Sequence, residues 1–307
     1  MHLTLLVPGL FWPREILRDT TYDLPLPALS LLLGRGRRRP AAPLDRWLAA
    51  AFGLTPPLPA APLRLLGDGG SPGSDCWICL DPVHWRLEER SVVLADPAEL
   101  ELDAKEDQAL RRSLAPLLAD FGEIHAPARG RWYLRLASDP KLETRDLTTA
   151  LGQAVDPAAP AGADGPAWRR LLAEAQMQLH AHPVNQAREA EGRPTVNSLW
   201  PWGAGRLPTP AAKPATALLS DDPMLQGLGR QAGLTAGPLP ATLPAIATPT
   251  LVHLHQLARP VAGHDALAWR EVLAGLDAAW LGPALAALGQ GRLRQLRLLA
   301  GGERHVE

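Results

Sequence analysis

The sequence has few cysteines and almost no net charge, and each scarcity excludes a class of protein. Two cysteines among 307 residues cannot build the disulfide framework of a small secreted domain. The formal net charge of -1 gives no overall attraction to nucleic acid or to an anionic membrane. No apolar run approaches the ~20 residues that a membrane-spanning helix needs.

A basic leader is also missing from the N-terminus, which reads MHLTLLVPGLFWP. The apolar stretch before Pro8 is too short for a signal peptide and is typical of a buried first strand. Hydrophobic residues make up 46% and charged residues 21%, which indicates a soluble globular protein of one large domain or two modest ones. We therefore expect a cytoplasmic protein without a membrane partner.

Both ends of the chain show the pattern of a parallel sheet with helices. Leu3–Val7 is a continuous apolar run that ends at Pro8-Gly9, which favours a central strand. Further strands are predicted at Ala217–Ser220, Thr250–His255 and Arg294–Leu299, and helices at Leu26–Leu33, Pro43–Gly53, Pro223–Ala232, Asp265–Leu276 and Ala279–Leu288. This alternation indicates a layered α/β fold.

The middle of the chain has the pattern of a smaller α+β unit. Asp103–Phe121 is an amphipathic helix, and Asp103 with Glu106 forms a capping-box pair at its start. A second helix is predicted at Ala167–Ala181, and strands at Cys76–Leu80, Ser91–Ala95 and Trp132–Leu136. The stretches Leu54–Pro62 and Asp156–Pro166 are typical of a hinge and a linker.

The densest group of polar and aromatic side chains is HPVNQAREAEGRPTVNSLWPWGAG, from His182 to Gly205. Four side chains carry hydrogen-bond donors suited to an anion: Asn185, Arg188, Arg193 and Asn197. One interpretation is a strand that leads through Gly203-Ala204-Gly205 into a tight loop at the rim of a ligand cleft. The other is a helix, a Gly-Arg-Pro turn and a core strand without a ligand, and composition alone favours it.

The same segment resembles a known family. Its letters follow N-x-x-R-x-x-x-G-[KR]-x-x-x-N-x-[IL]-W-x-W-G-x-G from Asn185 to Gly205. This pattern resembles a segment of the archaeal-type cofactor-independent phosphoglycerate mutases, members of the alkaline phosphatase superfamily. With LDPVHWR at Leu80–Arg86 and a short proline-rich N-terminal half, the chain looks more specifically like the bacterial RpfE-type regulatory proteins, which are shortened relatives of those mutases.

The resemblance implies an alkaline-phosphatase-like layered α/β core made from residues 1–62 and 182–307. A smaller α+β domain with a linker, residues 63–181, is inserted between them. A mutase of this superfamily uses two divalent metal ions held by Asp and His, and a Ser nucleophile that carries the phosphoryl group. These residue types can be sought at the matching positions of this sequence.

Several of those positions hold residues without the required chemistry. Pro8 stands where the mutases have the Asp of an Asp-Gly turn, and Pro260 stands where an Asp precedes His264 by four residues. The nucleophile has two candidate placements. Ser74, in a Gly-Ser-Asp sequence, matches the local letters, whereas Leu44 matches the position in the fold better and has no hydroxyl.

The remaining candidate ligands lie near the C-terminus. Glu303 and His305 follow the last predicted strand, and with His264 they are the candidate metal ligands. A complete two-metal centre needs about six ligands in fixed geometry, and these three residues fall short of it. We expect no cofactor in a silent relative, and Mn²⁺ or Zn²⁺ if the chain is an active enzyme.

Two other groups suggest chemistry by their spacing. Cys76-x-x-Cys79 has redox-motif spacing, but it lies in a predicted strand and not at a helix N-terminus that would lower a thiol pKa. With His84 the two cysteines offer three zinc ligands and no fourth. The arginines at 35 and 37–39 have no interleaved aromatic residues, which favours a solvated loop over a nucleic-acid site.

Two functional hypotheses follow. The first is a catalytically silent mutase-like protein with a regulatory role. It would bind a small anionic ligand or a protein partner through Asn185, Arg188, Arg193, Asn197 and Trp202. The alternative is an active metal-dependent phosphoglycerate mutase or phosphotransferase with Ser74 as nucleophile and a rearranged metal site. The loss of ligand chemistry at Pro8 and Pro260 favours the first.

Overall fold

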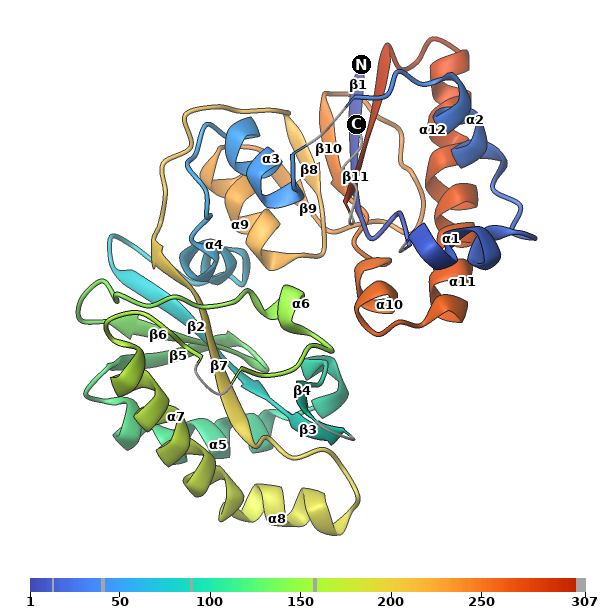
Figure 1. Ribbon diagram of the computed structural model, residues 1–307. Helices are drawn as coiled ribbons and strands as arrows, with labels where there is room; N and C mark the ends of the chain where they lie inside the picture. Colours follow the sequence, from blue (N-terminus) through green and yellow to red (C-terminus); the bar gives the residue numbers. More distant parts are fainter. Residues whose placement is uncertain (13, 40–41, 89–90, 157–158, 302–307) are drawn as a thin grey trace. The chain divides into compact units, whose positions relative to one another are not determined.

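The computed structural model describes the chain except residues 13, 40–41, 89–90, 157–158 and 302–307 (Figure 1). Internal contacts divide it into two compact units, residues 1–58 with 209–307 and residues 59–208. These boundaries differ from those predicted at residues 62/63 and 181/182. The second boundary lies further along the chain because the strand Ser198–Arg206, which we expected in the core, pairs with Cys76–Val83 of the inserted unit.

The first unit is built on a five-stranded parallel sheet. Its strands are β1 (His2–Pro8), β8 (Ala217–Leu219), β9 (Thr235–Gly237), β10 (Thr250–His253) and β11 (Gln295–Gly301). Their order is β11-β1-β10-β8-β9. The N-terminal strand therefore lies between the last two strands of the chain, and Leu3 is opposite both Thr250 and Leu296. The four predicted strands are confirmed, whereas β9 was not predicted.

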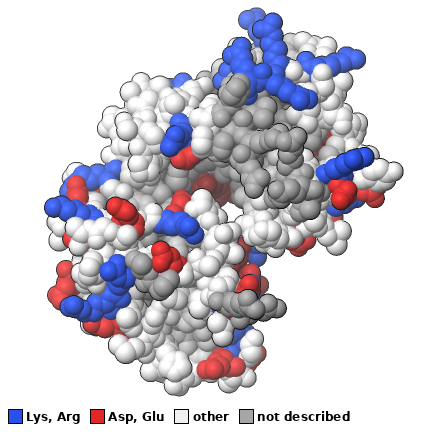
Figure 2. All heavy atoms as spheres, in the orientation of Figure 1, with Lys and Arg blue, Asp and Glu red and all other residues white. Residues whose placement is uncertain are grey.

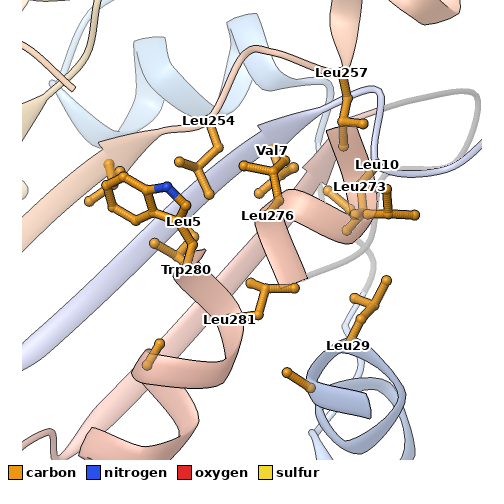
Figure 3. Packing of buried hydrophobic residues seen from close by; sticks show 14 of the residues in the cluster. Leu5, Val7, Leu10, Leu29, Leu254, Leu257, Leu273, Leu276, Trp280 and Leu281 are labelled. Carbon is orange, nitrogen blue, oxygen red and sulfur yellow. The ribbon is translucent and has the colours of Figure 1, made fainter. Parts of the chain in front are cut away.

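Helices cover both faces of this sheet. They are α1 (Arg14–Thr21), α2 (Pro27–Arg35), α3 (Leu44–Ala51), α9 (Pro223–Gln231), α10 (Ala258–Ala262), α11 (Ala266–Leu276) and α12 (Gly282–Gly289). On one face, Leu5 of β1 packs in the same core as Leu29 of α2 and Trp280 (Figure 3). On the other face, α9 places Gly229 against Leu218, because successive side chains of β8 point to opposite faces. The layered α/β class is confirmed.

Helices α11 and α12 are continuous through a π-helical turn at Asp277–Leu281. In the described part of the chain, Ala266–Gly289 is one helix whose length and mean hydropathy of 1.5 would suffice to cross a membrane. This differs from the expectation that no apolar run in the sequence is long enough to span a membrane. Trp269, Leu273 and Trp280 are buried in the core of the first unit, which is the pattern of a core helix in a globular protein.

The π-helical turn places the buried carboxylate of Asp277 at the N-terminus of α2. The backbone N–H groups of Ala28 and Leu29 donate to its two oxygens at 3.2 and 2.6 Å. Leu26, at the N-cap position of α2, offers no side-chain acceptor. Asp277 therefore satisfies N–H groups that a helix start leaves without partners, from a position far along the sequence.

The second unit is built on an antiparallel sheet. Its strands are β2 (Cys76–Val83), β5 (Gly122–Ala128), β6 (Arg131–Leu136) and β7 (Ser198–Arg206), in the order β5-β6-β2-β7, with a separate hairpin of β3 (Trp85–Glu88) and β4 (Ser91–Leu94). Its helices are α4 (Ala60–Gly67), α5 (Ala104–Leu118), α6 (Leu147–Ala150), α7 (Gly165–His180), α8 (Pro183–Ala190) and the 3₁₀ turn Pro97–Leu100. This is the predicted α+β class.

The two faces of this second sheet are covered by different helices. Leu80 of β2 packs with Leu114 of α5 and Leu171 of α7 in one hydrophobic core. Its neighbour Asp81 points to the opposite face, where it meets Arg64 of α4. The predicted capping box at the start of α5 is confirmed, since the Asp103 and Glu106 side chains each accept from the other's backbone N–H.

We predict that Asp277→Asn lowers the free energy of unfolding by about 2 kcal/mol. The amide keeps the shape of the carboxylate but removes the charge that faces the two N–H donors of α2. Denaturant unfolding followed by circular dichroism would measure the change. Glu271→Gln, an exposed position on α11, is the matched control. Equal unfolding midpoints for the two variants would contradict the proposed role of Asp277.

Candidate functional site

The segment with the sequence pattern forms α8, a turn at Gly192 and strand β7. The Asn185 amide donates to the carbonyls of Leu179 and Val196 at 2.8 and 2.7 Å, and it accepts from the Val196 N–H at 2.9 Å. Asn185 therefore ties the end of α7 to the chain that enters β7. All of its described partners are backbone groups of this chain, and its side chain is buried.

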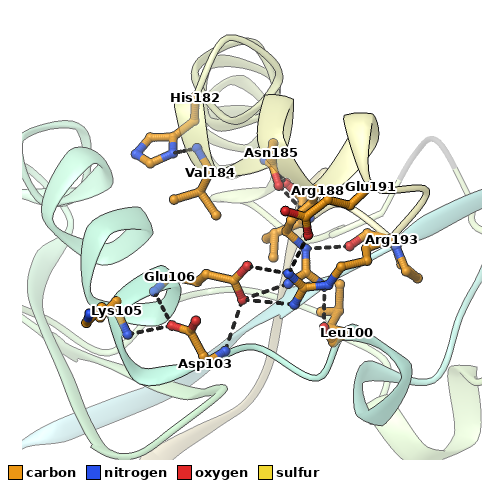
Figure 4. A network of polar contacts seen from close by, with 12 residues as sticks. Leu100, Asp103, Lys105, Glu106, His182, Val184, Asn185, Arg188, Glu191 and Arg193 are labelled. Carbon is orange, nitrogen blue, oxygen red and sulfur yellow. Dashed lines mark hydrogen bonds and ion pairs between the residues drawn. The ribbon is translucent and has the colours of Figure 1, made fainter.

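Arg188, Arg193 and Glu106 form a charged network between α8 and α5 (Figure 4). The buried Arg188 guanidinium donates to Glu106 at 2.7 Å, to the Pro194 carbonyl at 2.7 Å and to the Leu100 carbonyl. Burial alone would raise the pKa of Glu106, but the Asp103 N–H and Arg188 lower it overall. The network fixes α8 against the start of α5 through charge-assisted hydrogen bonds.

Asn197 and Trp202 continue the same pattern of internal bonding. The Asn197 side chain accepts from the Trp85 N–H at 2.7 Å and donates to the Trp85 carbonyl at 2.8 Å. Trp202 Nε1 donates to Asp81 at 2.8 Å. The described hydrogen bonds of these two side chains thus join the segment that holds β7 to β3 and β2 of the second unit. Their predicted role in ligand binding stays a prediction.

Asp81 and Arg64 make a buried bidentate ion pair, with oxygen–nitrogen distances of 2.6 and 2.5 Å. Their side chains are 1% and 7% exposed. The Arg64 guanidinium carbon lies 5.1 Å from the ring centroid of Tyr133 and 5.3 Å from the ring centroid of Trp202. These contacts enclose the charge between α4 and the sheet.

The Gly203-Ala204-Gly205 sequence lies within β7 and not in a loop at a cleft rim, which corrects the first interpretation. Gly203 has a φ of +66°, and a Cβ there would come within 2.7 Å of the Ala60 side chain. Gly205 approaches Pro59 equally closely. The glycines let β7 lie against α4, which supports the interpretation as a core strand for this part of the segment.

The parallel sheet of the first unit brings a different set of residues to one edge. Because its strands are parallel, β1, β8 and β10 all end at the same side, where open α/β sheets bind ligands. Pro8 ends β1, Ser220 follows β8, and His253 ends β10. The sequence signal was present in part, since Pro8 follows the predicted strand Leu3–Val7, Ser220 ends the strand predicted at Ala217–Ser220, and His253 lies near the end of the strand predicted at Thr250–His255. Ser220 and His253 are far apart in the chain, so only the sheet topology shows that they share an edge.

Ser220 and His253 form a buried polar pair at this carboxyl edge. Ser220 Oγ lies 3.2 Å from His253 Nδ1 and accepts from the Asp222 N–H at 3.0 Å. Burial lowers the pKa of His253 to about 4, an effect that Asp222 opposes and His255 reinforces. The imidazole is therefore neutral near pH 7.

Nearby segments carry polar atoms that the described chain leaves without hydrogen-bond partners. They are Trp12 Nε1, which follows β1, and His255 Nδ1 and Gln256 Oε1, which follow β10. Each is buried, so its missing partner has an energetic cost. A polar ligand with both donors and acceptors would satisfy them.

Two carboxylates at this edge already accept hydrogen bonds from the backbone. Asp222 accepts from the Met224 and Leu225 N–H groups at the start of α9, at 2.8 and 3.4 Å. Asp221 accepts from the Leu239 N–H at 2.9 Å. Among the described residues no group of three His, Cys, Asp or Glu side chains could hold a metal ion. The residues described here therefore do not fit a two-metal centre.

The predicted catalytic and metal-binding residues are dispersed. Ser74 lies in an exposed turn before β2 in the second unit, and its carbonyl accepts from Arg206. His264 belongs to the first unit, where it is exposed after α10 with a left-handed φ of +53°. Pro260 lies within α10. Glu303 and His305 are outside the described residues.

The candidate cysteines are buried in a strand, and the histidines His84 and His182 contact backbone groups. Cys76 and Cys79 are buried in β2 as free thiols. Burial raises the pKa of Cys76 to about 11 and also raises that of Cys79, so neither is a thiolate near neutral pH. His84 Nδ1 lies 2.9 Å from the Thr195 carbonyl, and His182 accepts from the Val184 N–H as the N-cap of α8.

We predict that Asp81→Asn destabilises the second unit by about 3–5 kcal/mol, because it leaves the Arg64 guanidinium buried without its counter-charge. Asp139→Asn is a matched control, since Asp139 makes a similar pair with Arg206 at the surface. That variant should cost much less, because solvent screens an exposed ion pair. Urea unfolding of both variants measures the two losses in the free energy of unfolding. Similar losses would contradict the prediction that burial makes the Arg64–Asp81 pair more costly to break.

We also predict a pH dependence from His253. Its pKa is about 4 when folded and 6.5 in the reference state, so the unfolded chain binds a proton that the folded chain excludes. The resulting stability is present above pH 6.5 and is lost as pH falls toward 4, by about 1.4 kcal/mol per pH unit at most. Urea midpoints between pH 7 and 4.5 should fall more steeply for the wild-type chain than for His253→Gln. Parallel curves would contradict this.

Curated proteins with similar sequences are phosphoglycerate mutases. The 2,3-bisphosphoglycerate-independent phosphoglycerate mutase of Methanosarcina mazei is 31% identical over 134 residues, which cover 37% of this chain and 34% of that protein. A probable mutase of the same kind from Geobacter sulfurreducens is 28% identical over 159 residues, covering 45% of this chain and 40% of that protein. The match thus spans well under half the length of these relatives. No family model matches the chain.

Two solved structures share the fold. The cofactor-independent phosphoglycerate mutase from Thermoplasma acidophilum aligns with a TM-score of 0.50 and 18% identity, over 99% of this chain and 88% of that one. The PH0037 protein from Pyrococcus horikoshii aligns with a TM-score of 0.55 and 18% identity, over 93% and 78% of the two chains. The chain is therefore phosphoglycerate mutase-like, with an alkaline-phosphatase-like α/β fold.

Proposed function

We propose that this protein is a catalytically silent relative of the cofactor-independent phosphoglycerate mutases, with a regulatory, ligand- or partner-binding role of the RpfE type. The observation that carries the proposal is the carboxyl edge of the parallel sheet. Pro8 offers no ligand atom there, and the carboxylates of Asp221 and Asp222 are engaged by backbone N–H groups. Metal-assisted phosphoryl transfer with two metal ions needs several Asp, Glu or His side chains around one point, and the described residues contain no such group of three.

The same edge retains features of a binding site. The buried donor Trp12 Nε1 and the buried acceptor Gln256 Oε1 have no partner among the described residues. Buried polar groups are normally satisfied, so a bound polar molecule would repay their desolvation. We expect the ligand of the regulatory state to contact these atoms, while the Asn185–Trp202 segment supports the second unit.

The test of catalytic silence measures metal content and turnover in the purified full chain. After dialysis against Mn²⁺ and removal of free metal, we expect substoichiometric metal by mass spectrometry and no conversion of 3-phosphoglycerate above the buffer rate. Ser74→Ala and His264→Ala should behave as the wild-type chain does. Two tightly held metal ions, with turnover that Ser74→Ala abolishes, would establish the active-enzyme alternative.

A further inference from the structure

A groove of about 330 Å³ runs beside β11 in the first unit. The residues that line it come from β11, from the end of α2 and from the segment that follows α2: Phe11, Leu32, Leu33, Gly36, Arg37, Arg38, Arg39, Gln295, Leu296, Arg297, Leu298 and Ala300. It extends along β11 from Gln295 to Ala300, whereas the polar residues of the carboxyl edge described above follow β1, β8 and β10.

The groove follows the free edge of the sheet. β11 is the outermost strand, and in the described part of the chain it pairs with β1 alone. Gln295, Leu296, Arg297 and Leu298 all line the groove, although successive side chains of a strand point to opposite faces. The groove therefore meets the strand edge-on, where backbone N–H and C=O groups can receive another strand.

Arginines form one wall of this groove. Arg38 donates through Nε and Nη2 to the Leu33 carbonyl at 3.1 and 2.7 Å, which anchors the segment to the end of α2. Arg37 and Arg39 are exposed, and among the described residues no carboxylate pairs with either. Figure 2 shows Lys and Arg side chains gathered at the top of the view, over the first unit.

The charge of the chain is divided unevenly between its two units. The first has 15 Lys and Arg against 11 Asp and Glu, and the second has 16 against 21. The basic side chains beside β11 thus belong to a unit with a net positive charge, which attracts acidic partners. The near-neutral charge of the whole chain conceals this division.

We propose that the groove binds an extended acidic segment of a partner protein, which adds as a strand to the free edge of β11. Backbone hydrogen bonds along β11 would supply affinity, and Arg37 and Arg39 would pair with carboxylates of the added strand. Leu296, Leu298 and Phe11 give the groove an apolar floor for alternate side chains. A nucleic acid fits less well, because Phe11 is the one aromatic residue among the lining residues.

The test uses the full chain and a fluorescent twelve-residue peptide of alternating Glu and Val. Fluorescence anisotropy should detect binding that weakens with salt, and hydrogen exchange should show new protection at residues 295–300. Arg37→Glu with Arg39→Glu should weaken binding by about tenfold or more, since two attractive charges become repulsive. Arg46→Glu, an exposed position on α3 outside the groove, should bind as the wild-type chain does.

Three probes separate strand addition from simple attraction between charges. A Glu/Val peptide with alternate backbone N-methyl groups keeps its charge but cannot complete a strand ladder, and it should fail to bind. A Lys/Val peptide should also fail. Equal binding of the methylated peptide, tighter binding of duplex DNA at the same arginines, or no binding of the unmodified peptide would each overturn the proposal. The result does not depend on whether the chain turns over phosphoglycerate.

Discussion

Parallel pairing of β1 with both β10 and β11 is the constraint on which the first unit depends. It places the start of the chain between its last two strands, so the long segment that connects β1 to β10 begins and ends at neighbouring strands of the sheet. Parallel pairing also fixes which residues share an edge. Pro8, Ser220 and His253 lie at one side of the sheet because their strands end there. The strand arrangement therefore decides which residues meet at this edge, and the identities of those residues then decide its chemistry.

The segment with the sequence resemblance has a scaffolding role in the described structure. Gly203 and Gly205 let β7 lie against α4, and Trp202 contacts the buried Arg64–Asp81 pair. A residue pattern of this kind can persist in a relative whose chemistry has changed, because close backbone approach and a buried ion pair tolerate little substitution. The similarity to mutases is consequently strong evidence for the fold and weaker evidence for an activity.

Part of the candidate site could be predicted from the sequence. Strand ends at Ser220 and His253 could be predicted from short apolar runs, and their shared edge from the parallel class. Their contact could not, because strand order in a sheet is set by long-range packing. Arg64 shows the same limit. It follows the proline-rich stretch Leu54–Pro62, and only its pairing with Asp81 across the fold accounts for its burial.

Local patterns in the sequence determined the elements whose signals lie within a few residues, such as the apolar run of β1 and the capping box at Asp103. Tertiary structure decided the rest. β5 forms because β6 pairs with it, although its sequence GEIHAPA has little strand character. α2 begins where it does because Asp277 caps it from far along the chain. The Asp277 contact joins residues 249 positions apart, so no short window of sequence contains it, and the buried N–H groups of α2 need such a partner.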